Sequence, residues 1–458
     1  MNKIIKNTFQ LLTVVLLLVT AGCKKKEVDL AKAFVKYYGG LKADAGVEVL
    51  QTSDGGYVIA GTSNIGTSNA DNYDMIVIKT DEHGNEVWHK TFGSANYDEC
   101  GDLGIMPDGG YILLGTFGIT SRNWSLDPFK LEAGKDSTQM VAVRIDALGN
   151  TIWQKPYNYS NPSVEVGTFG KSLVVNQDGT CFLGGMVDST DLSGGNTTPN
   201  LDLFALIIDQ DGALIKVGGV DMKPLRYGAD IEQDYMGDAI LAFSSSGMTE
   251  YLISSSTTLA GSNTPRLVKC RMNGVALTQN NAPSKTQWTQ SPGADKLLTG
   301  EQICRTSDNN YMMTGSSGTL PNADFYMFKL NGLSLDDNGI GFLKFYGGDG
   351  NDEGVSIIPT NDGGYAILAT TNSVVYTGAA EKQNDVLLMK LSGTGDIQWT
   401  KVFGGTGNDS ASKLIQTQDG GYLVCGTIAF GDDVSNSGAS NSITLIKVND
   451  KGEISNLK

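Results

Sequence analysis

Hydrophobic and polar residues alternate in short runs along most of the chain, and the runs come in groups of four. In the first group they cover residues 47–51, 57–61, 75–79 and 86–90. Alternation over such short runs is typical of half-buried β-strands. The runs are separated by Asp54-Gly55-Gly56 and by a His-Gly-Asn stretch, which contain the residue types that tolerate the positive φ of hairpin turns. The pattern therefore predicts a four-stranded antiparallel meander.

The same group recurs along the chain, so the fold is predicted to be built from repeats. The stretch "DGGYVIAGT" returns as "DGGYILLGT", "DGGYAILAT" and "DGGYLVCGT", and weaker copies begin at Asp178 and Asp308. The interval between these two is about twice the usual one, and residues 249–256 and 266–279 fill it as a degenerate copy. Seven units without helical periodicity predict an all-β protein, a seven-bladed β-propeller of four-stranded antiparallel blades over residues 36–458.

Large aromatic residues recur at one position of the repeat, near the start of the outer strand. They are Trp88, Trp153 and Trp399. A fixed position in stacked sheets favours packing between blades over a ligand cage. Residues 34–40 resemble the end of an outer strand without the rest of its unit, and Phe34 stands where the Trp would be. This segment is expected to close the ring, in competition with residues 452–457.

The connections between the strands fall into two classes. If each blade's strands are called A to D from the axis outward, the A-to-B and C-to-D turns lie on one face, which we call face two. The B-to-C and D-to-A loops lie on the opposite face, face one. Turns on face two are short and nearly identical, whereas loops on face one are long and individual, as at residues 117–138 and 428–442. Binding residues are usually found on such loops, so face one is predicted to be functional.

Two sets of residues are candidates for ligand binding on face one. Trp124 and Arg122 lie in a long loop of the second repeat and combine an aromatic surface with a polar group, which suits a sugar ring or a peptide. Asp98, Asp352 and Asp409 occupy matched positions and would surround the mouth of the central channel. The alternatives are that Trp124 packs its own loop and that the acids cap loop amides between blades. A Ca²⁺ ring is weakly signalled, because "GGDGNDEG" lacks the ligand spacing of a calcium loop.

The N-terminus has the three parts of a secretory signal: basic residues, an apolar stretch from 11 to 19, and small residues before Cys23. These small residues resemble the lipobox of bacterial lipoproteins, although Thr20 stands where Leu is commonest. We expect residues 1–22 to be a signal peptide, Cys23 to be lipidated and residues 23–35 to be a tether. The expected location is the bacterial outer membrane, on either its periplasmic or its cell-surface side.

Composition limits the partners, catalytic groups and metal sites that the sequence favours. A formal net charge of −16 repels phosphate backbones, so no nucleic-acid partner is expected. The two histidines, His83 in a turn and His89 on an outer strand, do not favour a His-based nucleophile or a His-ligated metal at the channel mouth. No C-x-x-C spacing occurs, and Cys270 with Cys304 is the one pair worth testing for a disulfide. No cofactor and no metal are predicted.

The repeat resembles the tandem propeller repeats, with D-G-G-Y turns and W-x-K-x-[FY]-G-G ends, of surface and secreted lipoproteins of the Bacteroidota. That resemblance implies an architecture and no reaction. A fainter similarity to quinoprotein dehydrogenases does not extend to their turn sequence, so no quinone cofactor is carried over. We expect a lipid-anchored envelope protein that binds a glycan, a peptide or a partner protein through face one. The alternative is a carboxylate-based glycan hydrolase or lyase, and a purely structural role in an envelope complex is a third.

Overall fold

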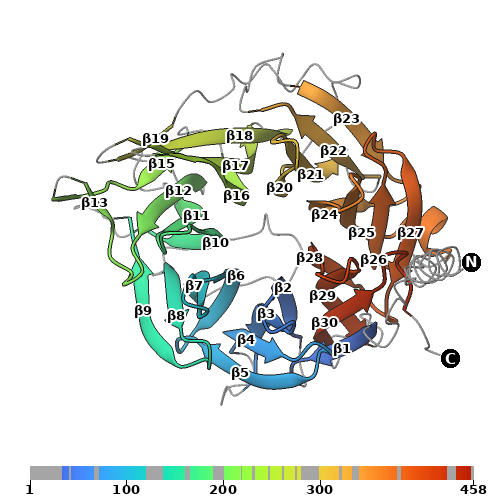
Figure 1. Cartoon of the computed structure of the whole chain (residues 1–458), viewed down its shortest axis with the longest axis horizontal. Helices are drawn as coiled ribbons and strands as arrows, with labels where there is room; N and C mark the ends of the chain where they lie inside the picture. Colours follow the sequence, from blue (N-terminus) through green and yellow to red (C-terminus); the bar gives the residue numbers. More distant parts are fainter. Residues whose placement is uncertain are drawn as a thin grey trace, which may run out of the picture.

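The computed structural model describes residues 33–40, 43–65, 72–119, 138–159, 166–188, 201–217, 219–228, 233–245, 248–259, 262–273, 276–279, 299–318, 322–332, 340–378, 383–430 and 440–454. Seven four-stranded antiparallel sheets surround a common axis and form a seven-bladed β-propeller (Figure 1). The predicted fold is therefore confirmed. Among the described residues the one α-helix is the single turn α2 (Val374–Thr377) on face one, and no helix is long and apolar enough to cross a membrane.

Each sheet is a blade whose strands follow one another from the axis outward. Blades 1 to 4 contain the strands β2 (Ala45–Gln51), β3 (Tyr57–Ser63), β4 (Asp74–Thr80), β5 (Glu86–Phe92); β6 (Tyr97–Ile105), β7 (Tyr111–Ile119), β8 (Gln139–Ile145), β9 (Thr151–Tyr157); β10 (Thr168–Val175), β11 (Cys181–Asp188), β12 (Leu201–Ile208), β15 (Leu225–Tyr227); β16 (Gln233–Ser245), β17 (Met248–Leu259), β18 (Ser262–Asn273) and β19 (Ala276–Gln279). The predicted degenerate copy is thus blade 4, and its first three strands are longer than those of the regular blades.

Blades 5 to 7 continue the ring. They contain β20 (Gln302–Arg305), β21 (Tyr311–Ser317), β22 (Asp324–Leu330), β23 (Ile340–Tyr346); β24 (Asp352–Pro359), β25 (Tyr365–Thr371), β26 (Asp385–Leu391), β27 (Ile397–Phe403); β28 (Ser410–Gln416), β29 (Tyr422–Phe430), β30 (Ser440–Val448) and β1 (Phe34–Tyr38). A separate hairpin, β13 (Lys216–Val217) with β14 (Val220–Asp221), is inserted between the last two strands of blade 3.

The ring is closed by the N-terminal strand. β1 pairs antiparallel with β30, with Phe34 opposite Lys447 and Tyr38 opposite Ile443, so the outer strand of blade 7 comes from the start of the chain (Figure 1). Of the two segments that competed for this place, the N-terminal one occupies it. The strand begins at Phe34, slightly before the boundary at residue 36 that the sequence suggested.

Apolar residues on the two middle strands of each blade supply the core. Every residue of β3 is buried, and β4 is buried from Met75 onward, because both faces of these strands are covered by neighbouring blades. One hydrophobic cluster lies at each of the seven junctions; that between blades 1 and 2, for example, contains Val58, Val77, Leu103 and Leu113. A blade therefore depends on its neighbours for its core, as expected of a repeat architecture.

Candidate functional site

The aspartate of each D-G-G-Y turn holds a nearly buried cation. In blade 1, Asp54 accepts a hydrogen bond from the amide of Gly56 at 3.0 Å, and its Oδ2 lies 2.9 Å from Nζ of Lys79. The Lys79 side chain is 9% exposed. The equivalent pairs in other blades are Asp108–Arg144, Asp308–Lys329, Asp362–Lys390 and Asp419–Lys447. The turn aspartates on face two are thus engaged within their own blades.

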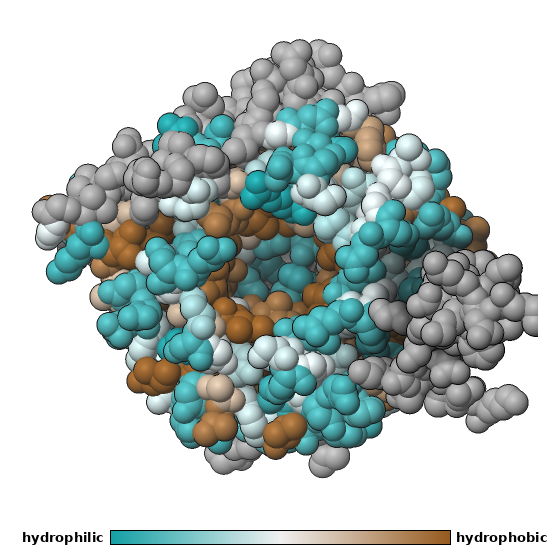
Figure 2. Space-filling view, viewed as in Figure 1, coloured by the Kyte–Doolittle hydropathy of each residue, from teal (hydrophilic) through white to brown (hydrophobic). Residues whose placement is uncertain are grey.

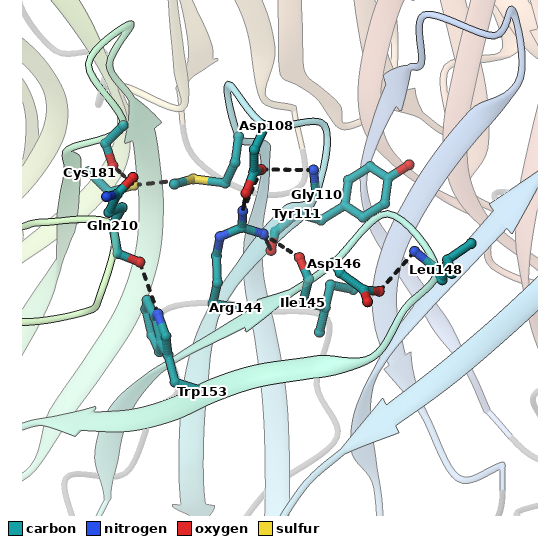
Figure 3. A network of polar contacts seen from close by, with 12 residues as sticks. Asp108, Gly110, Tyr111, Arg144, Ile145, Asp146, Leu148, Trp153, Cys181 and Gln210 are labelled. Atoms are coloured by element: carbon teal, nitrogen blue, oxygen red, sulfur yellow. Dashed lines mark hydrogen bonds and ion pairs between the residues drawn. The ribbon is translucent and has the colours of Figure 1, made fainter.

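Figure 3 shows this arrangement in blade 2, where Arg144 reaches the turn from strand β8. Its guanidinium contacts Asp108 and donates to the carbonyl oxygen of Tyr111 at 3.1 Å. In blade 6, burial would raise the pKa of Asp362, but hydrogen bonds from Thr360 and Lys390 lower it to about 2. The charge of this turn is therefore retained at any physiological pH.

The tyrosine of the same turn joins neighbouring blades together. The Tyr111 ring lies 6.2 Å from that of Trp88 in the preceding blade, and Tyr422 lies 5.7 Å from Trp399. Trp153 packs against Gly212 and donates from Nε1 to the carbonyl oxygen of Gln210 at 3.0 Å (Figure 3). The interpretation of these tryptophans as inter-blade packing is confirmed.

Phe34 takes the tryptophan's role at the closing junction, as predicted. Its ring lies 6.1 Å from that of Tyr57 and packs against Gly84. Tyr38 on the same strand donates to the carbonyl oxygen of Gly84 at 2.6 Å. Both contacts join blade 7 to blade 1.

The predicted acids at the channel mouth are buried caps of face-one loops. Asp98, Asp352 and Asp409 are fully buried near the start of their innermost strands. Asp98 accepts from the amide of Gly118 at 2.8 Å, and Asp409 accepts from the amides of Gly405 at 2.6 Å and Ala429 at 2.7 Å. These contacts match the loop-capping alternative, and a role in ligand binding stays a prediction.

Asp352 and Asp44 likewise accept hydrogen bonds from residues of face-one loops. Asp352 accepts from the amide of Gly348 at 2.9 Å and from the Ser373 hydroxyl at 2.7 Å. Asp44 accepts from the amide of Gly40 at 2.5 Å. Burial raises the pKa of Asp44, Asp98 and Asp352, and the hydrogen bonds that each accepts oppose that rise.

A second acid, absent from the sequence prediction, lies beside each of several capping aspartates. A Cβ built on Gly93 would lie 2.1 Å from Oδ1 of Asp74 and 2.7 Å from Oδ2 of Asp98, so the two carboxylates flank one glycine. Burial and the charge of Asp98 raise the pKa of Asp74 to about 6. Gly404 is flanked in the same way by Asp385 and Asp409. These pairs could have been found from the Asp that begins the third strand in three of the repeats, at Asp74, Asp324 and Asp385.

At the junction of blades 3 and 4 the acid pair has basic partners. Nε of Arg226 lies 2.6 Å from Asp202, and Nη1 of Arg266 lies 3.0 Å from Asp234. Both aspartates are fully buried. Burial raises the pKa of Asp234 to about 6, against the opposing charge of Arg266.

Several predicted residues lie outside the part of the chain that the structure describes. Trp124 and Arg122 belong to residues 120–137, and Cys23 belongs to residues 1–32. The two histidines are where the sequence placed them: His83 in a face-two turn and His89 on the outer strand β5, 2.7 Å from Glu86. Cys270 and Cys304 are free thiols.

A group of charged residues that the sequence reasoning missed lines the central channel. We call it the channel cluster: Glu48, Asp102, Asp238 and Lys413, from the innermost strands of blades 1, 2, 4 and 7. Oε2 of Glu48 lies 2.7 Å from Nζ of Lys413. Figure 2 shows the centre of the ring hollowed, with polar and apolar surface on its walls.

The charges of the cluster interact across the channel. Burial raises the pKa of Asp102, and the charges of Glu48 and Asp238 raise it further, although blades 2 and 4 are not neighbours. Burial also raises the pKa of Glu48, against the lowering effect of Lys413. Burial alone would lower the pKa of Lys413, but Glu48, Asp238 and Asp102 together raise it.

Backbone amides fix the orientation of these carboxylates. Asp102 accepts from the amides of Leu103 at 2.7 Å and Leu173 at 2.6 Å. Asp238 accepts from the amide of Ala239 at 2.7 Å and from the Ser172 hydroxyl at 2.9 Å. Hydrogen bonds therefore hold both carboxylates in one orientation.

The cluster depends on a bulge in the innermost strands. The pairing shifts by a residue next to Glu48, Asp102, Asp238 and Lys413 alike. A bulge redirects the side chains that follow it. The available signal in the sequence was a charged residue six positions before the turn aspartate in three repeats.

Nothing in the described part of the chain forms a group of three or more His, Cys, Asp or Glu side chains that could hold a metal ion.

Comparison with known proteins identifies no family for this chain. No protein-family model matches the sequence, and no curated protein matches it. A protein of unknown function from Bacteroides caccae is 10% identical, with a TM-score of 0.38 over 79% of this chain and 94% of its own. A PL25 ulvan lyase is 11% identical, with a TM-score of 0.45 over 92% and 97%. An α-L-arabinanase from Penicillium chrysogenum is 11% identical, with a TM-score of 0.40 over 90% and 98%. These similarities carry no argument about activity.

Proposed function

We propose that this chain is a lipid-anchored propeller of the bacterial cell envelope that binds a glycan, a peptide or a partner protein through face one. The observation that carries the proposal is the difference between the two faces. On face two, turn aspartates of five blades are occupied by a lysine or arginine of the same blade. Face one carries the individual loops.

The anchoring part of the proposal rests on the sequence before the first strand. A signal-like apolar stretch ends in small residues directly before Cys23, and β1 begins soon afterwards at Phe34. A lipid on Cys23 would hold the ring close to the membrane through a short tether. Acylation of one cysteine by several chains gives stable anchoring.

A screen of the full-length protein, purified in detergent, against immobilised glycans and peptides tests the binding role. We expect specific retention that weakens on Trp124→Ala by about 1–3 kcal/mol, as for a stacking aromatic at the centre of an interface. His83→Ala, a change of an exposed face-two side chain, is the matched control and should leave binding unchanged. Loss of binding on changes to face two would contradict the proposal.

One observation favours the enzymatic alternative enough to test it. A carboxyl group with a raised pKa beside other carboxylates is what a general acid for glycan cleavage requires, and Asp102 has that environment. Release of reducing ends or unsaturated products from a retained glycan, abolished by Asp102→Asn, would establish this function in place of simple binding.

A further inference from the structure

The chain enters the ring on face two. Strand β1 begins there, because Phe34 packs against Gly84 in the C-to-D turn of blade 1, and it ends at Tyr38 towards face one. Residues 24–33 separate this strand from Cys23, and they span at most about 36 Å even when fully extended. A lipid on Cys23 would therefore hold the face-two end of β1 within that distance of the membrane.

Exposed aliphatic residues lie on face two on either side of this entry point. We call them the apolar arc; they occupy the first residues of outer strands or the turn before, and they are Val87 on β5, Leu148 before β9, Ile152 on β9 and Ile397 on β27. Each is between 51% and 72% exposed. Strands β27, β1, β5 and β9 follow one another along the outside of the ring (Figure 1). The arc therefore covers blades 6, 7, 1 and 2, with the start of β1 between its ends.

A bulge turns two residues of the arc outward. The pairing of β4 with β5 skips Val87, and that of β8 with β9 skips Ile152, whereas Trp88 and Trp153, the residues that follow, have partners in the register. A bulge redirects side chains at its position. The tryptophans pack against the next blade, so the core does not require an aliphatic residue at the skipped positions. Contact with an apolar medium outside the ring would account for them.

The same rim carries both signs of charge. Lys36 donates from Nζ to Oδ1 of Asn85 at 2.9 Å, and Lys155 donates to the carbonyl oxygen of Asp211 at 2.7 Å. Exposed acids of the face-two turns, such as Asp146, accompany these lysines. Lysine can lay its aliphatic stem on an apolar surface while its ammonium stays in the polar layer above. A rim of this kind suits headgroups that themselves carry both signs of charge.

We propose that the apolar arc docks on the phospholipid surface in which Cys23 is anchored. The inference rests on the lipid anchor of the proposed function and adds the part of the ring that meets the membrane. The four aliphatic side chains enter the headgroup layer, as the apolar face of an interfacial segment does. A bilayer is favoured over a protein partner because the chain leading to Cys23 leaves the ring within this arc. Face one then points away from the membrane and is open to a ligand.

Hydroxyl-radical footprinting of the full-length lipidated protein tests this docking. The protein is placed on vesicles of phosphatidylcholine and phosphatidylethanolamine and compared with Cys23→Ser in solution. We expect oxidation of the apolar arc to fall several-fold on the vesicles. Tyr37, Val375 and Phe430 are exposed apolar residues of face one and serve as internal controls. Their oxidation should be unchanged.

Two matched variants separate docking of the arc from attachment through the lipid alone. Ile152→Ser combined with Ile397→Ser removes exposed apolar groups without touching the core, so oxidation of Val87 and Leu148 should return towards its rate in solution. Val375→Ser makes the same kind of change on face one and should leave the protection of the arc intact. Full protection of Val87 and Leu148 in the double variant would overturn the inference.

Flotation of the vesicles distinguishes failure of the inference from failure of the proposed anchor. A protein that floats with the vesicles while its arc is oxidised as in solution, or while face one is protected instead, would overturn docking of the arc and leave the anchor in place. A wild-type protein that does not float would overturn both. Protection of the arc in native membranes but not on pure lipid vesicles would identify a protein partner and overturn docking on lipid.

Discussion

The aspartate of the D-G-G-Y turn shapes its turn and neutralises a cation that would otherwise be buried alone. Asp362 accepts from the Gly364 amide at 3.1 Å and contacts Nζ of Lys390, whose side chain is 3% exposed. Blade 3 provides a natural contrast. Asp178 accepts from the amide and hydroxyl of Thr180, but the strand position equivalent to Lys390 is Ile207.

Asp362→Ala should lower the free energy of unfolding by about 1–2 kcal/mol, because it leaves the Lys390 ammonium without its counter-ion; the estimate is reduced for the solvent exposure of Asp362. Asp178→Ala removes a comparable turn without stranding a cation, so it should cost less. Urea denaturation of both variants measures the difference. Equal losses would mean that the hydrogen bonds within the turn, and not the pairing with Lys390, account for the contribution of Asp362 to stability.

Asp74 illustrates a residue that opposes stability at neutral pH. Its carboxylate shares Gly93 with Asp98, and its Oδ1 accepts no hydrogen bond in the described part of the chain. Asp74→Asn should therefore raise the free energy of unfolding at pH 7 by about 1–2 kcal/mol, with a smaller gain near pH 5 where Asp74 is largely protonated.

The matched variant at the next acid pair should behave oppositely. Asp202→Asn removes the partner of Arg226 and is expected to destabilise the protein. Thermal unfolding of both variants at pH 7 and near pH 5 tests these two expectations. A loss of stability for Asp74→Asn at neutral pH would contradict the view that the Asp74–Asp98 pair is uncompensated.

At the scale of the elements, ring closure depends on strand β1, the five residues Phe34–Tyr38 that precede blade 1 in the sequence. Strand β1 covers the outer edge of β30 and places Phe34 and Tyr38 against Gly84 of blade 1. Without β1, blade 7 would have three strands and would lose the contacts of Phe34 and Tyr38 with blade 1. The edge of β30 would then be open for pairing with other chains.

A protein that begins at Gly40 should therefore be less stable than one that begins at Ala33 by at least about 3 kcal/mol, since it loses an inter-strand ladder and the packing of an aromatic residue. Denaturant titration compares the two, and light scattering should show more association in the shorter chain. Equal stability would mean that another segment closes the ring.

Over the whole molecule, two sets of carboxyl groups respond to pH in opposite ways. Burial raises the folded-state pKa of Asp74 and Asp234 to about 6. It also raises the pKa of Asp44, Asp98 and Asp352 and of the channel acids Glu48 and Asp102. Stability from such groups is present below the unfolded pKa and is lost as the pH rises through the folded pKa. The turn aspartates have lowered pKa values, so their contribution is lost only in strong acid.

The protein should consequently be most stable near about pH 5, and its melting temperature should fall between pH 5 and 7.5 and again below about pH 3. Calorimetry across this range measures the profile. A melting temperature that rises steadily from pH 5 to 7.5 would mean that the buried acids are compensated in the folded protein.

Attachment to the membrane is also argued at the scale of the whole molecule. Cys23→Ser should abolish lipidation and move the protein from the membrane fraction to the wash, because the apolar stretch before residue 23 is too short to span a bilayer comfortably. Fractionation with metabolic labelling by palmitate tests both effects. An unchanged distribution would contradict the lipoprotein proposal.

The sequence alone determined the strands, the turns and the number of blades. Two-residue alternation and the glycines of the D-G-G-Y turns are local signals, and Gly55 does adopt the positive φ that its turn requires. Asp98, Asp352 and Asp409 lie near the start of the innermost strands of their blades, because their position in the repeat fixes their position in a blade.

Only the tertiary structure decided which side chains meet. Lys413 and Glu48 lie near opposite ends of the sequence, and they form an ion pair because β1 closes the ring and brings blade 7 against blade 1. The burial of the capping acids and the partnership of Asp202 with Arg226 likewise arise where blades pack together. Local patterns specify each blade, whereas contacts across the ring and the channel exist only when all seven blades are assembled.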